Sequence, residues 1–364
     1  MQESQSQDRA PDRNKKIHVL VVDDSPLMCK ALSRILSEDP AFHIVGQALN
    51  GEEAIEALSK TPCDVCTLDV HMPGMSGLSA LKHIMIRSPV PTLMVSAFTS
   101  EGSRVTFEAL RYGAVDFFQK PSQDKGEDLD AQKALLQERV KRAARVQVKA
   151  ARYLRLKQVA AGHPDAIKAA SGQGPETQGG IIVISASTGG YASLLSLLPA
   201  TSAPSKPIIV SVRAQTRYLR AFVDYLATYV SFNMKLAEDN EVLHNGTVYF
   251  INSDDAASLE QKGEDLLLSI TPRPRLSDRE SGLDLLLYSA SEHFGNRVLA
   301  VFLSGDGADG LSGAKEVLRL GGRVLAQSPA TCLAPETPIM AARELGVETC
   351  LLNEIAKDIH PDIQ

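Results

Sequence analysis

The sequence predicts an α/β protein with two parallel-sheet domains, and three observations support this fold class. Short apolar runs alternate with stretches of helical periodicity, as strands and helices do in a parallel-sheet protein. The pattern stops at a basic, polar stretch and begins again at Ile181. The chain of 364 residues is long enough for two domains that each bury a full core.

The composition is typical of a globular protein in a reducing compartment. Hydrophobic residues make up 44% of the chain and charged residues 23%, and the net charge of −6 argues against a nucleic-acid partner. No apolar stretch reaches the length of a membrane span, so we expect no membrane insertion. Residues 1–16 are polar and lack the apolar centre of a signal peptide, which predicts a disordered tail and a cytoplasmic protein. The odd number of cysteines, five, fits that location.

Polar residues stand where the apolar runs of the first half end. The runs and the residues that follow them are Ile17–Val22 before Asp23 and Asp24, Cys63–Leu68 before Asp69, Pro91–Val95 before Ser96, and Ala114–Phe118 shortly before Lys120. Because the carboxyl ends of parallel strands meet at one edge of a sheet, we expect three carboxylates, one amine and one hydroxyl to converge there.

These groups predict a magnesium-dependent phosphoryl site. Clustered carboxylates need a cation, and oxygen ligands suit Mg²⁺, which completes its shell with water and phosphate oxygens. An aspartate can form an aspartyl phosphate, while Lys120 neutralises phosphoryl charge and Ser96 donates a hydrogen bond. The alternative is that each acid only ends a strand or caps a helix, as Asp24 could before Ser25. That alternative accounts for any one of these residues better than for all five.

Four motifs of the first half, VVDDSP, LDVHMPGMSGL, MVSAFT and FFQKPS, resemble the receiver domain of two-component response regulators. The resemblance covers about residues 17–121 and implies a (βα)5, flavodoxin-like fold. It implies that a histidine kinase phosphorylates Asp69.

The same resemblance assigns roles to the residues around Asp69. Mg²⁺ would be held by Asp24, Asp69 and the backbone carbonyl of His71, with Asp23 assisting through water. The phosphoryl switch would consist of Ser96 and Phe117, with Lys120 beside them.

The second half contains two units of strand, glycine-rich loop and helix. The strand IIVIS leads into Ser185–Gly190, and the strand VLAVFLS leads into Gly305–Gly310, so both loops belong at one edge of a parallel sheet. Backbone N–H groups at the start of each helix can hold an anion. A serine in one loop, Ser187, and an aspartate in the other, Asp309, are two members of a Ser-His-Asp triad or two helix caps, and these residues alone leave both open.

Two segments between these units, Val248–Ile251 and Leu266–Ile270, have β character, and we expect them to pair as a hairpin.

The motifs SASTGG, GTVYF, SGLDLLLYSA, SGDGADG and GGRVLAQ, over about residues 180–356, resemble the output domain of the CheB family. Members of that family are chemotaxis response regulators that act as protein-glutamate methylesterases and deamidate certain receptor glutamines. The resemblance implies a Rossmann-like sheet, with Ser187 as nucleophile and Asp309 as orienting acid. It implies an oxyanion hole from backbone N–H near Asp306, and it includes Thr188, in the other loop, among the residues of this region. It implies a chemotaxis histidine kinase and methyl-accepting chemoreceptors as partners.

One departure from the family pattern concerns the catalytic histidine. The family places it in a Gln-His-Met-Pro turn after the second strand, and here Arg213 occupies that place after PIIVSV. A guanidinium stays protonated and has no free lone pair, so it cannot accept the serine proton. The histidines of this half are His244, His293 and His360, and none follows that strand.

Other departures change the charge around the loops. Asp306 stands where the family has a methionine, which adds negative charge beside an expected oxyanion site. We hypothesise that Arg213 pairs with Asp309 or Asp306 in a charge-compensated site that no longer catalyses.

The predicted domains are a tail (1–16), a receiver (17–122), a basic helical linker with a hinge (123–179) and a methylesterase-like domain (180–360). Two functions are compatible with this order. The first is a regulator that is phosphorylated on Asp69 and whose output domain binds receptors without hydrolysis. The second is an active methylesterase and glutamine deamidase that acts through Ser187 with a base not yet identified.

Overall fold

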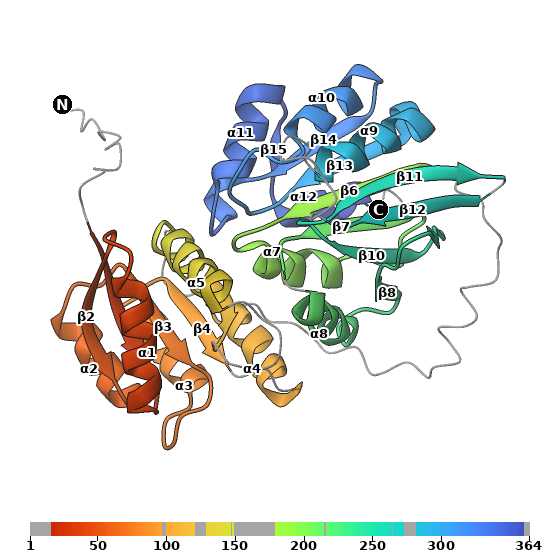
Figure 1. Ribbon diagram of the computed structural model, residues 1–364. Coiled ribbons are helices and arrows are strands. Elements are labelled where there is room, and N and C mark those ends of the chain that lie inside the picture. The colour runs from red at the N-terminus through yellow and green to blue at the C-terminus, as the bar shows by residue number, and fades with distance from the viewer. Residues whose placement is uncertain are drawn as a thin grey trace, which may run out of the picture.

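The computed structural model describes residues 16–96, 100–120, 129–146, 148, 179–214, 216–263, 265–272 and 282–359. The chain forms two α/β lobes that lie side by side, the first coloured red to yellow and the second green to blue in Figure 1. Residues 1–15 of the predicted tail and nearly all of the predicted hinge lie outside the described residues, as does His360. Within the described ranges, no helix is long and apolar enough to cross a membrane.

The first lobe is a parallel sheet in the order β2-β1-β3-β4-β5 with helices on both faces. Its strands are β1 (Ile17–Val22), β2 (Phe42–Ala48), β3 (Val65–Asp69), β4 (Thr92–Ser96) and β5 (Asp116–Gln119). Its helices are α1 (Pro26–Ser37), α2 (Gly51–Lys60), α3 (Gly77–Arg87), α4 (Ser100–Arg111) and α5 (Leu129–Ala144). This is the flavodoxin-like strand order, which confirms the predicted fold class.

Polar caps explain where the first helices begin. The side chain of Ser25 accepts a hydrogen bond from the backbone N–H of Met28, and Pro26 occupies the first turn of α1. At α2, Asn50 accepts from the N–H of Glu53, while the Glu53 carboxylate accepts from the N–H of Leu49. These caps start each helix just past the strand end and leave the edge of the sheet open.

The second lobe is built on a parallel sheet in the order β15-β14-β13-β6-β7-β10-β8. Its strands are β6 (Ile181–Ala186), β7 (Ile208–Val212), β8 (Asn233–Leu236), β10 (Thr247–Asn252), β13 (Val298–Phe302), β14 (Arg323–Gln327) and β15 (Thr349–Cys350). Its helices are α7 (Gly190–Leu197), α8 (Thr216–Ala227), α9 (Gly282–Phe294), α10 (Leu311–Arg319), α11 (Glu336–Leu345) and α12 (Leu352–Ile359). Short 3₁₀ helices are η2 (Leu198–Ala200), η4 (Gly295–Arg297) and η5 (Pro329–Thr331).

A small antiparallel sheet, β11-β12-β9, lies beside the large one and corrects one prediction. It consists of β9 (Glu241–Val242), β11 (Ala256–Lys262) and β12 (Asp265–Thr271). The expected pairing of Val248–Ile251 with Leu266–Ile270 is wrong, because β12 pairs with β11 while β10 pairs with β7 and β8. The reason is burial: β10 is apolar on both faces, as a central parallel strand must be, whereas β12 buries alternate residues.

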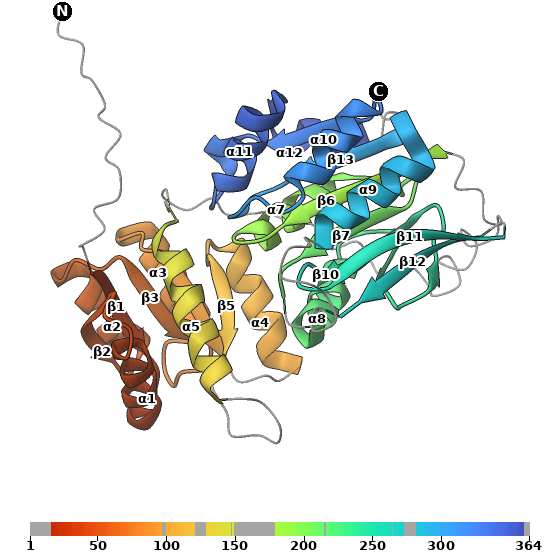
Figure 2. The ribbon, with the colours of Figure 1, turned by 45° about the horizontal axis from the view of Figure 1, so that its top comes forward.

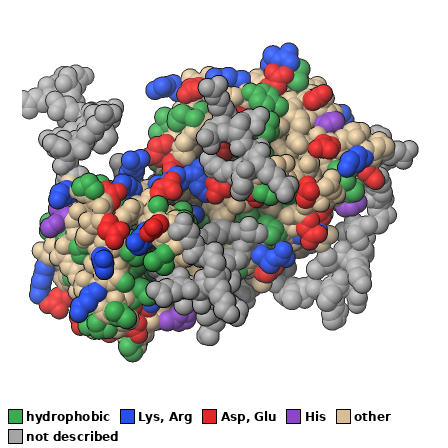
Figure 3. Space-filling view, viewed as in Figure 1, with side chains coloured by type: hydrophobic (Ala, Val, Ile, Leu, Met, Phe, Trp, Pro, Cys, Tyr) green, Lys and Arg blue, Asp and Glu red, His purple; other side chains and the backbone are tan. Residues whose placement is uncertain are grey.

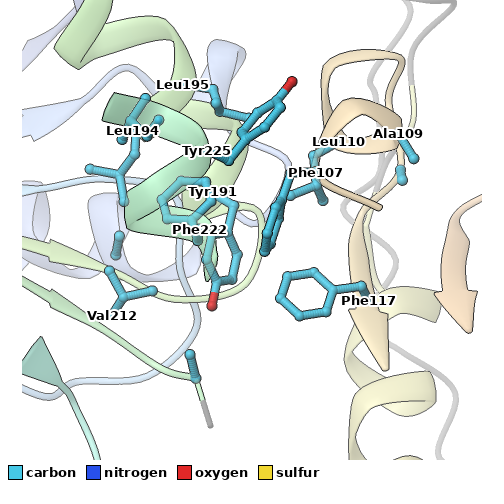
Figure 4. Close-up of a cluster of buried hydrophobic side chains, with 14 of the residues drawn as sticks. Phe107, Ala109, Leu110, Phe117, Tyr191, Leu194, Leu195, Val212, Phe222 and Tyr225 are labelled. Carbon is cyan, nitrogen blue, oxygen red and sulfur yellow. The ribbon is translucent and has the colours of Figure 1, made fainter. Parts of the chain in front are cut away.

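The two lobes share one hydrophobic core, in which α4 of the first lobe packs against α7 and α8 of the second. Figure 2 shows α4, β5 and α5 as the elements of the first lobe nearest the second. Phe107 of α4 lies 5.4 Å, ring centre to ring centre, from Phe117 and from Phe222, and Figure 4 shows these rings converging. The Arg111 side chain also donates a hydrogen bond to the Tyr229 hydroxyl at 3.3 Å. The lobes are therefore held together by aromatic packing as well as by polar contacts.

Replacing Phe107 with alanine should weaken this packing. Phe107 is 1% exposed, and its ring contacts those of Phe117, Phe222 and Tyr225. Removing a buried phenylalanine side chain costs about 3–5 kcal/mol, so urea should unfold the variant at a clearly lower concentration. Leu27→Ala, at a side chain that is 78% exposed, is the control and should change stability by less than about 0.5 kcal/mol. Coincident unfolding curves for the two variants would contradict the packing described.

Candidate functional site

Three carboxylates meet at the carboxyl edge of the first sheet, as the strand ends predicted. Asp23 and Asp69 are buried, Asp24 is exposed, and one oxygen from each lies within 4.8 Å of the other two. The Lys120 ammonium lies 2.7 Å from an oxygen of Asp23 and 2.8 Å from an oxygen of Asp69. A set of carboxylate oxygens this close together fits a hard divalent cation such as Mg²⁺, which would relieve the repulsion between them.

Burial and charge act in opposite directions on this cluster. Burial raises the pKa of the Asp69 carboxyl above its ordinary value, and the hydrogen bond and charge of Lys120 only partly offset that effect. Burial alone would lower the pKa of the Lys120 ammonium, but its hydrogen bonds to Asp23 and Asp69 outweigh burial and raise it. Lys120 therefore stays charged between the two acids.

The other predicted residues of the first site lie on or just after β3, β4 and β5. The backbone N–H of His71 hydrogen-bonds to the Asp69 carboxylate, and the Lys120 N–H donates to the Ser96 carbonyl at 2.9 Å. Ser96 is buried at the end of β4. Phe117 is buried on β5, with its ring centre 5.2 Å from that of Tyr191 and 4.9 Å from that of Tyr218 in the second lobe. One member of the expected switch pair is thus part of the lobe interface.

The second site is formed where β6, β7 and β13 end. In the sheet, Ala186 at the end of β6 is opposite Val212 at the end of β7, so the next residues, Ser187 and Arg213, are neighbours at the sheet edge. The Arg213 N–H donates to the Ala186 carbonyl at 3.4 Å. On the other side of β6, the Ser187 N–H donates to the Ser304 carbonyl at 3.1 Å, which ties the two glycine-rich loops together.

Glycine is required where the first of these loops turns into α7. Gly189 has a φ of 73°, and a Cβ there would lie 2.6 Å from the Leu333 Cβ. A Cβ at Gly190 would lie 2.6 Å from that of Ala186. The turn that places Ser187 and Thr188 at the sheet edge therefore requires glycine at the two positions that follow them.

The Asp306 carboxylate accepts hydrogen bonds from both hydroxyl groups of this loop. Ser187 Oγ donates to Asp306 Oδ1 at 3.1 Å and accepts from the Asp306 backbone N–H at 3.0 Å. Thr188 Oγ1 donates to the same carboxylate oxygen at 2.7 Å. The N–H that the family resemblance assigns to an oxyanion hole is therefore bonded to the serine itself.

The second oxygen of Asp306 is bound by the other lobe. Arg142 of α5 places Nε 3.1 Å from Asp306 Oδ2, with side-chain exposures of 19% and 24%. Burial by itself raises the pKa of the Asp306 carboxyl. The hydrogen bond from Thr188 and the positive charges of Arg142 and Arg213 lower this pKa, and together they outweigh burial. The net result is a pKa below the ordinary value, so this carboxylate is ionised at neutral pH.

The arginine that forms an ion pair with Asp306 is thus Arg142, and not Arg213 as hypothesised. Among the described residues, Arg213 has no carboxylate oxygen within 4 Å, although its charge still acts on Asp306. Arg142 belongs to the basic helical stretch that the sequence places after the receiver, and its role depends on how the lobes pack.

A triad also needs an orienting acid, for which Asp309 stays a prediction, and a histidine. Asp309 is half-buried in the loop before α10, but the carboxylate bonded to Ser187 is that of Asp306. The His293 ring lies 3.2 Å from the Leu259 carbonyl, and the His244 backbone N–H donates to the Tyr249 hydroxyl. Neither histidine hydrogen-bonds to Ser187.

The raised pKa of Asp69 makes Mg²⁺ binding sensitive to acid. Protons compete with Mg²⁺ for the carboxylates, so affinity should begin to fall at a pH above the ordinary aspartate pKa of 3.8. Titrating Mg²⁺ into the ¹⁵N-labelled protein at several pH values measures this. Asp24→Asn should weaken binding by at least about tenfold, and Asp130→Asn, at an 87% exposed side chain, should not. Binding that is unchanged by Asp24→Asn would contradict this site.

The Arg142–Asp306 ion pair should stabilise the contact between the lobes at neutral pH. Because the folded-state pKa of Asp306 is lowered, its contribution is present above the pKa of an unfolded aspartate and is lost as pH falls through the lowered value. A double-mutant cycle with Arg142→Gln and Asp306→Asn should give a coupling energy of about 0.5–3 kcal/mol at pH 7. The coupling should shrink at low pH, and additive effects at pH 7 would rule the pair out as a stabilising contact.

Comparisons with known proteins agree with this architecture. Residues 19–130 match the family model of the response regulator receiver domain, and residues 182–359 match that of the CheB methylesterase. The chain is 34% identical to a protein-glutamate methylesterase/protein-glutamine glutaminase of Pyrococcus abyssi, over 93% of this chain and 90% of that protein. A protein of the same description from Geobacter metallireducens is 32% identical, over 95% and 98% of the two chains. The chain therefore belongs to the CheB family, with a receiver domain followed by a methylesterase domain.

Proposed function

We propose that this protein is a chemotaxis response regulator whose receiver domain is phosphorylated on Asp69 and whose output domain binds chemoreceptors without hydrolysing their esters. One observation carries the proposal: the residue beside Ser187 at the end of β7 is Arg213. No described histidine bonds to Ser187. Family membership supports a cytoplasmic histidine kinase and methyl-accepting chemoreceptors as partners.

The receiver site is equipped for phosphoryl transfer from a kinase histidine. An Asp69 oxygen would attack phosphorus as the bond to the histidine nitrogen breaks, and Lys120 would stabilise the charge on the phosphoryl oxygens. Asp23, Asp24, Asp69 and the His71 carbonyl would hold Mg²⁺. The ion, when bound, neutralises charge on the phosphoryl group. Ser96, at the end of the neighbouring strand, would donate to the transferred group.

Ester hydrolysis, by contrast, finds no suitable base beside Ser187 among the residues that the structure describes. Ser187 must lose its proton as it attacks, and the adjacent guanidinium of Arg213 cannot accept one. The Asp306 carboxylate does accept the Ser187 hydrogen bond, but its lowered pKa makes it a weak proton acceptor. Its negative charge would also repel the oxyanion of a tetrahedral intermediate.

The second candidate function is an active methylesterase and glutamine deamidase. It is favoured by the contact between Ser187 and a carboxylate, and by curated relatives that carry that name across nearly the full chain. In this case Asp306 would take the place of the missing histidine as the base.

Methanol release from methylated chemoreceptor membranes distinguishes the two functions. We expect no release above that of Ser187→Ala, with or without a phosphoryl donor, while Asp69 takes up phosphoryl groups in the presence of Mg²⁺ and Asp69→Asn does not. Arg213→His restores an imidazole beside Ser187 and should raise release if only the base is missing. Release by the unmodified protein that depends on Ser187 would establish the methylesterase instead.

A further inference from the structure

The cleft beside Thr188 and Asp306 is a cavity of ≈ 450 Å³ bounded by both lobes. Its charged lining consists of Arg142, Arg145, Arg213, Asp306 and Glu336. On the face shown in Figure 3, side chains of both charges are interspersed near the junction of the lobes. A hydrolytic site for a neutral ester has no need of several arginines, so the lining indicates another ligand.

Of the two arginines that are mostly shielded from solvent, only one is paired. Arg142 forms ion pairs with Asp306 in the cavity and with Glu138 on its own helix. Arg213 has no ion-pair partner within 4 Å among the described residues, and its Nε atom is buried without a hydrogen-bond partner. A guanidinium without an acceptor is costly, and because the Arg213 side chain lines the cavity, an anion bound there would supply a partner for its charge.

The charges also indicate what the acceptor is. Arg145 and Glu336 are exposed at the rim and carry opposite charges. Inside, Asp306 compensates Arg142, which leaves the single positive charge of Arg213. One carboxylate would balance that charge, whereas a dianionic phosphate would leave an excess negative charge next to Asp306. The planar guanidinium group also matches the two oxygens of a carboxylate.

We propose that this cavity binds the free γ-carboxylate of a glutamate side chain in a partner protein, with Arg213 as the residue that recognises it. The inference rests on the proposed function, because it takes the chemoreceptor as the partner and the absence of hydrolysis as given. Arg213 lines the cavity together with Thr188 and Asp306, so a side chain that enters it brings its carboxyl group to the guanidinium. The site then distinguishes the demethylated receptor from its methyl ester, which carries no charge.

The test uses the full-length protein and two small probes, N-acetyl-glutamate N-methylamide and its γ-methyl ester. Arginine Nε–H resonances are followed in ¹H–¹⁵N spectra. We expect the acid to shift the Arg213 resonance with a Kd of about 1 mM, the range of a single ion pair, and the ester to bind at least about tenfold more weakly. Arg213→Gln should abolish the difference between the probes, and Arg213→Lys should retain part of it. Arg319→Gln, at an exposed arginine on α10, is the matched control and should bind as the unmodified protein does.

Equal binding of acid and ester by the unmodified protein would overturn the inference without reference to any variant. Inorganic phosphate that binds at least tenfold more tightly than acetate would also overturn it. No shift by the acid, with no methanol formed from the ester probe, would refute the carboxylate site and leave the proposed function intact. Methanol formed from the ester probe in a Ser187-dependent manner would refute the proposed function itself.

Discussion

The contacts across the cleft between the two lobes depend on the carboxylate of Asp306. It accepts hydrogen bonds from Ser187 and Thr188 of its own lobe and pairs with Arg142 of the other. A largely buried carboxylate is stable only when its lone pairs are filled, and these contacts fill them. The same carboxylate therefore holds the serine loop in place, draws α5 to the cleft and occupies the hydroxyl that a hydrolase would need free.

The sequence predicts the contents of each sheet edge because parallel strands end together. Asp23, Asp69 and Lys120 follow separate strands, yet they lie in contact. The position of Arg213 beside Ser187 follows in the same way, since both residues come directly after neighbouring strands. The fold class follows from the alternation of apolar runs and helices, which local periodicity records directly. The chemical roles of these residues stay predictions.

Features that depend on packing between distant segments were not predictable. Nothing in the periodicity of α5 indicates that Arg142, rather than another of its basic residues, meets Asp306. The position of Phe117 against Tyr191 depends likewise on the docking of two lobes. The pairing expected for the hairpin was wrong for a related reason: β character shows that a segment is a strand but not which strand it pairs with.

The receiver site and the cleft are joined by a short, continuous path of packed groups. Lys120 follows β5, which carries Phe117, and the Phe117 ring contacts Tyr191 in the first turn of α7, directly after the serine loop. Packing of this kind provides a route for coupling, but coupling itself needs an element with two arrangements. Helix α5 is the candidate, because Arg139 pairs with Asp116 of β5 and Arg142 pairs with Asp306 across the cleft. A phosphoryl group on Asp69 would draw Lys120 toward new charge and shift the end of β5. Because Arg139 ties α5 to Asp116 and Arg142 ties it to Asp306, a movement of β5 that reached Asp116 would act on both ion pairs.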